Sequence, residues 1–143
     1  MTDNDKKVIL VGGCFDIIHF GHISFLKQAK ELGNHLIVAL ESDNNVRLAK
    51  GEQRPIHTQL QRKEMLEAMN FVDEVILLPY MQSDKEYFDF VKRVHPDIIA
   101  ITEGDPFAEK KSHQAKEIGA SLVVIPKIHT LSTSQLAKLL GLE

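Results

Sequence analysis

Five short apolar runs recur along this chain, and segments with the spacing of amphipathic helices separate them. The runs are rich in Val, Ile and Leu, which is typical of strands buried on both faces. They are Val8–Val11, His35–Leu40, Glu74–Leu78, Asp97–Ile101 and Ser121–Ile125. Strands that alternate with helices form a parallel sheet with helices on both faces, joined by right-handed crossovers. The five runs therefore predict a Rossmann-like, doubly wound α/β sheet of five parallel strands.

The segments between the runs carry helix signals. The first helix is expected to begin at the two histidines, His19 and His22, and to stop at Gly33. Further helices are expected at 58–70, 83–94, 108–118 and 133–140, and three of them open with the capping box S/T-x-x-E/Q. These boxes are Thr58 with Gln61, Ser83 with Glu86, and Ser132 with Gln135. The stretch from Glu41 to Pro55 is polar and charged, and it is expected to be a loop. No repeat or linker interrupts the 143 residues, so we expect a single domain, 1–143.

Composition excludes several classes of protein. The net charge is −3, from 17 Lys and Arg against 20 Asp and Glu, and it gives no reason to expect a nucleic-acid or membrane partner. One cysteine excludes an internal disulfide framework and favours a reducing compartment. The first residues are polar, unlike a signal peptide, and no apolar run approaches the roughly 20 residues of a membrane span. We therefore expect a cytoplasmic protein.

The turn after the first run predicts a phosphate site. Gly12 and Gly13 end the run, and His19 and His22 stand where the next helix begins. A helix N-terminus favours anions, and glycine lets a phosphate approach the backbone. The dinucleotide motif G-x-G-x-x-G, for which Glu41 would be the ribose ligand, is absent, and so is the P-loop. Two histidines would also suit a metal, but the sequence supplies no third ligand at a fixed spacing.

Two motifs carry a resemblance to a known family. G-C-F-D at 13–16 followed by H-F-G-H at 19–22 resembles the first motif of the nucleotidylyltransferase superfamily, in its cytidylyltransferase-like branch. S-T-S at 132–134 resembles the second motif, I-S-[ST]-[ST]. That branch includes glycerol-3-phosphate cytidylyltransferase, the adenylyltransferase domain of ADP-heptose synthesis and archaeal-type FAD synthetases. Further similar blocks are Ser42-Asp43, Lys50-Gly51, Gln61-Arg62, Val72–Val75 and Gly104-Asp105.

The resemblance implies transfer of a nucleoside monophosphate from ATP or CTP to a small phosphorylated acceptor, with release of pyrophosphate. Glycerol-3-phosphate enzymes carry R-T-x-G before the second motif, whereas this chain has Lys127 and no glycine there. Lysine lacks the bidentate fork of arginine, which weakens the resemblance to the glycerol-3-phosphate enzymes. The stretch from Gly104 to Gly119 more closely resembles the heptose-phosphate adenylyltransferase domains. The expected acceptor is a sugar or polyol phosphate, of the heptose 1-phosphate or glycerol 3-phosphate type. Transfer to FMN and a non-catalytic nucleotide-binding module are the alternatives.

The residues and the resemblance together assign roles. The expected catalytic residues, which contact the triphosphate, are His19, His22, Lys50, Ser132 and Thr133. Those expected to bind the nucleotide are Gly13, Cys14, Phe15, Gly104, Asp105 and Lys127. Those expected to bind the acceptor are Asp16, Asp43, Arg62 and Asp73, the last also a candidate ion-pair partner of Arg62. We expect Mg²⁺ held mainly by phosphates and water, with no dedicated protein ligand, and a homodimer.

Overall fold

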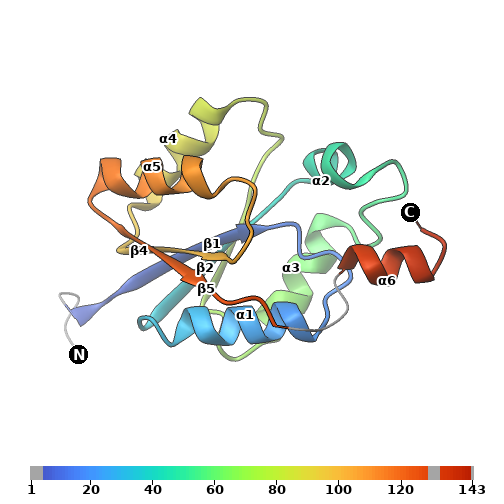
Figure 1. Ribbon diagram of the computed structural model, residues 1–143, viewed down its shortest axis with the longest axis horizontal. Coiled ribbons are helices and arrows are strands. Elements are labelled where there is room, and N and C mark those ends of the chain that lie inside the picture. The colour runs from blue at the N-terminus through green and yellow to red at the C-terminus, as the bar shows by residue number, and fades with distance from the viewer. Residues whose placement is uncertain (1–4, 129–132, 143) are drawn as a thin grey trace.

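The computed structural model describes residues 5–128 and 133–142, and this part of the chain forms one five-stranded sheet flanked by helices (Figure 1). All pairings are parallel and the strand order is β3-β2-β1-β4-β5. The strands are β1 (Val8–Gly13), β2 (His35–Leu40), β3 (Glu74–Leu77), β4 (Ile98–Thr102) and β5 (Ser121–Ile125). The predicted α/β fold is confirmed. The order reverses between β1 and β4, which is where doubly wound sheets bind ligands.

Each face of the sheet buries its own apolar cluster, because side chains alternate along a strand. Ile9 and Val11 of β1 pack on one face with α1 and α3, whereas Leu10 packs on the other with α4 and α5. Figure 1 shows these two helix pairs on opposite sides of the sheet. The helices are α1 (Phe20–Lys30), α2 (Asp43–Lys50), α3 (Gln59–Glu67), α4 (Asp84–Val94), α5 (Ala108–Ile118) and α6 (Thr133–Leu139).

Helix α2 occupies a stretch that the sequence predicts to be a loop. Ser42 caps it, since its hydroxyl accepts from the Asn45 N–H at 3.1 Å. Val46 is fully buried and anchors the helix to the core. One buried apolar residue in eight gives no helical periodicity in the sequence, so the prediction of a loop is wrong here.

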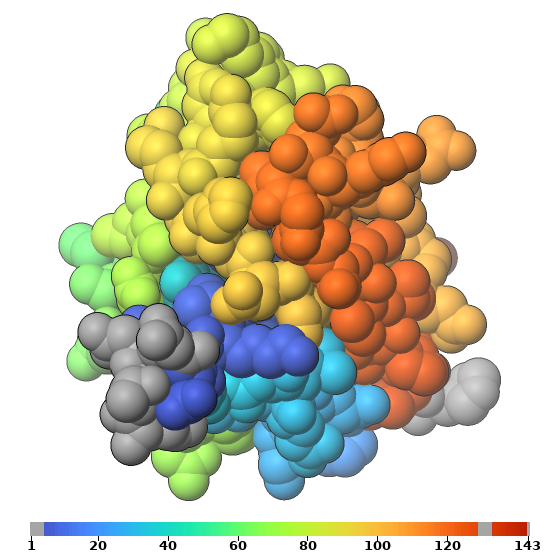
Figure 2. All heavy atoms as spheres, turned by 90° about the vertical axis from the view of Figure 1, so that its left-hand side faces the viewer, coloured from blue at the N-terminus to red at the C-terminus, as the bar shows by residue number. Residues whose placement is uncertain are grey.

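Asp73 lies at the amino end of the sheet, away from the turns that follow the strands. Its carboxylate accepts from the Leu36 N–H at 2.7 Å, at the start of β2, and pairs with Lys30. Figure 2 looks onto this end, where the chain around residues 5–8 lies beside the end of α1. The structure therefore contradicts both the acceptor-binding role predicted for Asp73 and its pairing with Arg62.

The helices that the structure describes are all too short or too polar to span a membrane.

Candidate active site

Two histidines cap the N-terminus of α1. His19 is the N-cap, and its Nδ1 accepts from the Gly21 N–H at 3.0 Å. The Nδ1 of His22 accepts from the His19 N–H at 3.1 Å, so the pair forms a reciprocal capping box. The ring centroids are 4.0 Å apart. Because each Nδ1 is an acceptor, each neutral ring carries its proton on Nε2. The cap thus presents two N–H donors beyond the helix start, where an anion is favoured.

Both imidazoles are uncharged at neutral pH. Burial lowers the pKa of His22 to about 4, and the charges of His19, Lys50 and Arg54 act in the same direction. Burial also lowers the pKa of His19. The pair therefore offers hydrogen-bond donors in a fixed tautomer rather than a charged cluster.

The lowered pKa of His22 makes stability depend on pH. The unfolded chain takes up a proton near pH 6.5 and the folded chain near pH 4, so stability is lost as pH falls between these values. The loss is about 3 kcal/mol at the acid end of this range. In His22→Gln, glutamine still accepts the His19 N–H but does not titrate. Urea midpoints measured from about pH 7.5 to about pH 4.5 should converge for wild type and variant in acid. If the urea midpoints of wild type and variant keep the same difference at every pH, the lowered pKa of His22 is contradicted.

The start of α6 reaches this histidine pair. Thr133 Oγ1 lies 3.4 Å from His22 Nε2 and donates to the Ile17 carbonyl at 3.3 Å. His22 and Thr133 are 111 positions apart in the sequence, and the fold brings them together. Ser132, the first residue of the second motif, lies outside the described residues.

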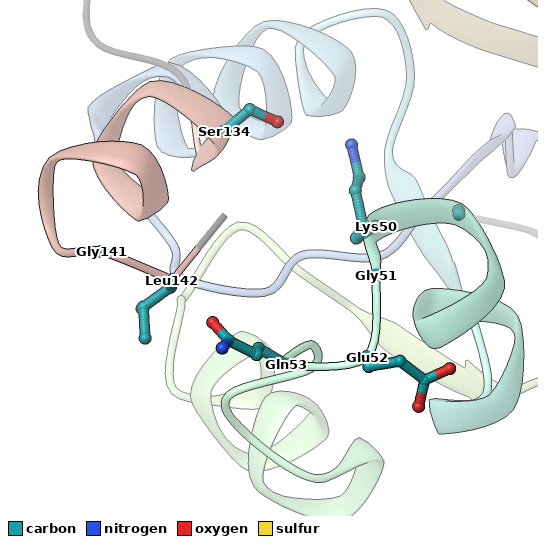
Figure 3. Close-up of a pocket in the computed structure, with 8 residues that line it drawn as sticks. Lys50, Gly51, Glu52, Gln53, Ser134, Gly141 and Leu142 are labelled. Atoms are coloured by element: carbon teal, nitrogen blue, oxygen red, sulfur yellow. The ribbon is translucent and has the colours of Figure 1, made fainter.

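A cavity of about 600 Å³ separates the end of α2 from α6, a volume typical of small-molecule sites. Figure 3 shows Lys50 extending into this space on the side of Ser134. Gly51 follows with φ 110°, a backbone conformation that glycine adopts without strain. The lining residues are Ala49, Lys50, Gly51, Glu52, Gln53, Ser134, Gly141 and Leu142. The structure thus places Lys50 at the end of α2, across the cavity from Ser134 of the second motif.

Asp16 ties the first motif to the segment that precedes α3, and its carboxylate is enclosed there. It is 1% exposed and accepts from Arg54 Nε at 2.7 Å and from the backbone N–H groups of Ile56 and His57 at 2.8 and 3.1 Å. Burial alone would raise the pKa of Asp16, but these donors hold it below its usual value. The acceptor-binding role predicted for this residue does not fit a carboxylate enclosed in this way.

Phe15, next to it, is 5% exposed and fills the core under His22, with the ring centroids 5.5 Å apart. A Cβ on Gly13 would lie 2.9 Å from this ring. Glycine is therefore required at 13 by core packing. The side chain of Phe15 packs against His22 and is buried in the core. Only the backbone of Phe15 could therefore bind the nucleotide as predicted.

Arg62 joins the ends of β1 and β2. It is fully buried, and its guanidinium donates to the carbonyls of Cys14 at 2.7 Å and Glu41 at 3.0 Å. It also donates to the His57 carbonyl and, at 2.7 Å, to the carboxylate of Asp43. With its donors used inside the protein, Arg62 positions the site, which contradicts its predicted direct contact with the acceptor. Asp43, partly exposed, remains at the edge of the site.

Cys14 has no sign of a reactive thiol. Burial raises its pKa, and the nearby Lys50 charge opposes that rise. A protonated thiol is a weak nucleophile, so Cys14 serves as a small side chain in a tight turn.

The turn after β4 holds the residues predicted to meet the base. Gly104 has φ 83°, and Asp105 accepts from the Phe107 N–H and from Lys111 Nζ, both at 2.7 Å. The backbone N–H of Lys127 donates to Glu103 at 3.3 Å, which places the end of β5 beside the same turn. Asp105 is therefore engaged within its own loop, and its contact with a base stays a prediction.

Sequence reasoning missed a partly buried pair beside the site. The Tyr87 hydroxyl donates to Glu41 Oε2 at 2.8 Å, which joins α4 to the end of β2. The residues are 46 positions apart and belong to no motif, so no signal in a single sequence pairs them. In residues 5–128 and 133–142, no three metal-ligating side chains of the types His, Cys, Asp and Glu gather in one place.

Comparison with known proteins identifies the family of this chain. Residues 10–134 match the cytidylyltransferase-like family, and the chain belongs to this family of nucleotidyltransferases. It is 38% identical over 143 residues to a FAD synthase of Thermococcus sibiricus, covering 98% of this chain and 94% of that protein.

Two further proteins are similar to the chain. Bifunctional protein HldE of Campylobacter jejuni is 46% identical over 99 residues, which are 69% of this chain and 21% of HldE. The chain thus matches about a fifth of that longer protein. A lipopolysaccharide core biosynthesis protein of Thermoplasma volcanium superposes with a TM-score of 0.70 at 26% identity, covering 86% of this chain and 97% of the other.

Proposed function

We propose that this nucleotidyltransferase moves a nucleoside monophosphate from ATP or CTP to the phosphate of a sugar or polyol phosphate. The observation that carries the proposal is the pair of neutral Nε2–H donors at the start of α1, facing Thr133. The Lys50 turn lies across the adjoining cavity. The two imidazole donors on α1 and the ammonium group at the end of α2 suit a triphosphate better than they suit a single small anion.

The chemistry is a single displacement. An oxygen of the acceptor phosphate attacks the α-phosphorus, the bond from that phosphorus to the bridging oxygen breaks, and pyrophosphate leaves with the electron pair. The attacking oxygen is already anionic, so no general base is needed. His19 and His22 stabilise charge on the phosphate oxygens, and Lys50 adds a positive charge. Mg²⁺ fits this donor set as an ion bound by phosphates and water, where it would neutralise charge.

Relatives support two kinds of acceptor. The similarity to HldE and to a lipopolysaccharide core biosynthesis protein favours a sugar phosphate. The FAD synthase of Thermococcus sibiricus matches along almost its whole length, which makes transfer of an adenylyl group to FMN the second candidate.

Pyrophosphate release tests the proposal. ATP and CTP, each with Mg²⁺, are crossed with heptose 1-phosphate, glycerol 3-phosphate, FMN and phosphoethanolamine. We expect release with one nucleotide and a sugar or polyol phosphate. Release with FMN alone selects the second candidate. Nucleotide binding without release from any pair contradicts an enzyme and indicates a binding module.

We also propose a homodimer, from the family resemblance. Several large apolar side chains are exposed, among them Phe20, Leu139 and Leu140 at 66%, 73% and 67%. A second copy would cover part of such surface. Sedimentation velocity measures the assembly directly, and a monomer at micromolar concentration contradicts the proposal.

A further inference from the structure

Glu41 is a half-buried carboxylate at the edge of the site that the phosphate chemistry leaves unused. It follows Leu40 at the carboxyl end of β2, and its backbone N–H donates to the Gly13 carbonyl at 3.0 Å. Leu40 packs on the face covered by α1 and α3. Because side chains alternate between the two faces of a sheet, the Glu41 side chain points to the face covered by α4 and α5. The hydrogen bond to Tyr87 of α4 agrees with that direction.

The pair with Tyr87 offers acceptors and no donor. The Tyr87 hydroxyl gives its one proton to Glu41 Oε2. The lone pairs of that hydroxyl and those of Glu41 Oε1 remain, and no other hydrogen bond to this carboxylate occurs within residues 5–128 and 133–142. Burial raises the pKa of Tyr87 above its usual value, and the hydrogen bond to Glu41 acts in the same direction, so the phenol keeps its proton.

A strand position without a side chain lies on the same face of the sheet as this pair. Gly12 lies on the same face of β1 as Leu10, and a Cβ there would meet only the Ala39 carbonyl oxygen, at 3.8 Å. On the α5 side stands Lys111, held by Asp105 at 2.7 Å. Helices α4 and α5 lie side by side over this face (Figure 1). The absence of a side chain at Gly12 leaves room where the strand order reverses.

We propose that Glu41, supported by Tyr87, binds hydroxyl groups of the acceptor, which is therefore a polyhydroxylated phosphate. A carboxylate repels the acceptor's phosphate, so it faces the rest of that molecule. Hydroxyl groups supply the protons that these oxygens lack, and a hydrogen bond to a charged acceptor is among the stronger ones. Sugar phosphates, polyol phosphates and the ribityl chain of FMN share this chemistry. Phosphoethanolamine has no such hydroxyl group. The inference rests on the proposed transfer reaction.

The test compares Glu41→Gln with wild type in steady-state pyrophosphate release. Glutamine keeps the size of the side chain and loses its charge. We expect the KM for the hydroxylated acceptor to rise roughly 10- to 100-fold, with the KM for the nucleotide within about twofold. Tyr87→Phe, which removes the supporting hydroxyl, should raise the same KM by a smaller factor. Glu64→Gln, on the exposed face of α3, removes one negative charge elsewhere and serves as the control.

The outcomes separate the two proposals. Wild-type activity with an unchanged acceptor KM in Glu41→Gln overturns the role of Glu41 and leaves the transfer reaction standing. If the wild-type enzyme prefers phosphoethanolamine as acceptor, the proposed binding of hydroxyl groups by Glu41 is also overturned. The carboxylate would then bind the ammonium group of that acceptor. If the wild-type enzyme releases no pyrophosphate with any pair of nucleotide and acceptor, the transfer reaction and this inference are both overturned. Sugar phosphate, glycerol phosphate and FMN, assayed separately, show which hydroxylated chain is used.

Discussion

Replacing His19 by asparagine is expected to lower kcat by about 10²–10³-fold, the usual loss for one donor to a developing charge. The Nδ1 of His19 caps α1, and its Nε2–H faces away from that cap. Asparagine is among the best N-cap residues, so its side-chain oxygen can accept the Gly21 N–H in place of Nδ1. It has no group at the position of Nε2. The variant therefore removes the donor and keeps the cap.

Three measurements decide this prediction. The melting temperature should stay near the wild-type value, because the cap is retained. The dissociation constant of the nucleotide should change far less than kcat, since transition-state donors act mainly on the rate. Equal losses of affinity and turnover would contradict a catalytic role and indicate plain nucleotide binding.

Replacing Asp16 by asparagine should destabilise the protein by about 3–5 kcal/mol, the typical result of breaking a buried ion pair. The carboxylate is enclosed and pairs with Arg54, which is itself 1% exposed. The variant leaves a buried guanidinium beside a neutral amide. Urea denaturation at neutral pH measures the loss. Asp89→Asn, in an exposed ion pair on α4, should leave the urea midpoint nearly unchanged and is the matched control.

This prediction also separates two interpretations of Asp16. A structural role predicts lost stability, with the acceptor KM little changed in whatever fraction remains folded. Wild-type stability together with a raised acceptor KM would restore the role predicted from the sequence. The paired variant Asp16→Leu with Arg54→Met should recover part of the stability, because it removes both charges.

The sheet could be predicted because each strand is a local apolar pattern. A run such as His35–Leu40 is buried on both faces, and its almost continuous apolar sequence predicts that burial. Helix α2 lacked such a pattern, since Val46 is its one buried residue. Helix α1 begins at Phe20, because the His19 side chain acts as an N-cap in place of the more common serine or threonine.

The histidine site could be predicted because its parts lie within one turn and one helix start. The roles of Asp16 and Arg62 could not, because a charged residue in a sequence is expected on the surface and both are buried here. Asp73 follows a helix and lies at the wrong end of the sheet, which depends on the register of β2 with β3. The pairing of Glu41 with Tyr87 depends on how α4 packs over β2.

The most direct test follows the α-phosphate itself. A nucleotide labelled with radioactive phosphorus at its α-phosphate is incubated with Mg²⁺, the acceptor and the enzyme, and the products are separated. Nucleotidyl transfer at this site predicts that the label appears in a product joined to the acceptor, with one pyrophosphate released for each molecule formed, and that His19→Asn slows both together. Label found in free nucleoside monophosphate, or retained wholly in the triphosphate, would contradict nucleotidyl transfer at this site.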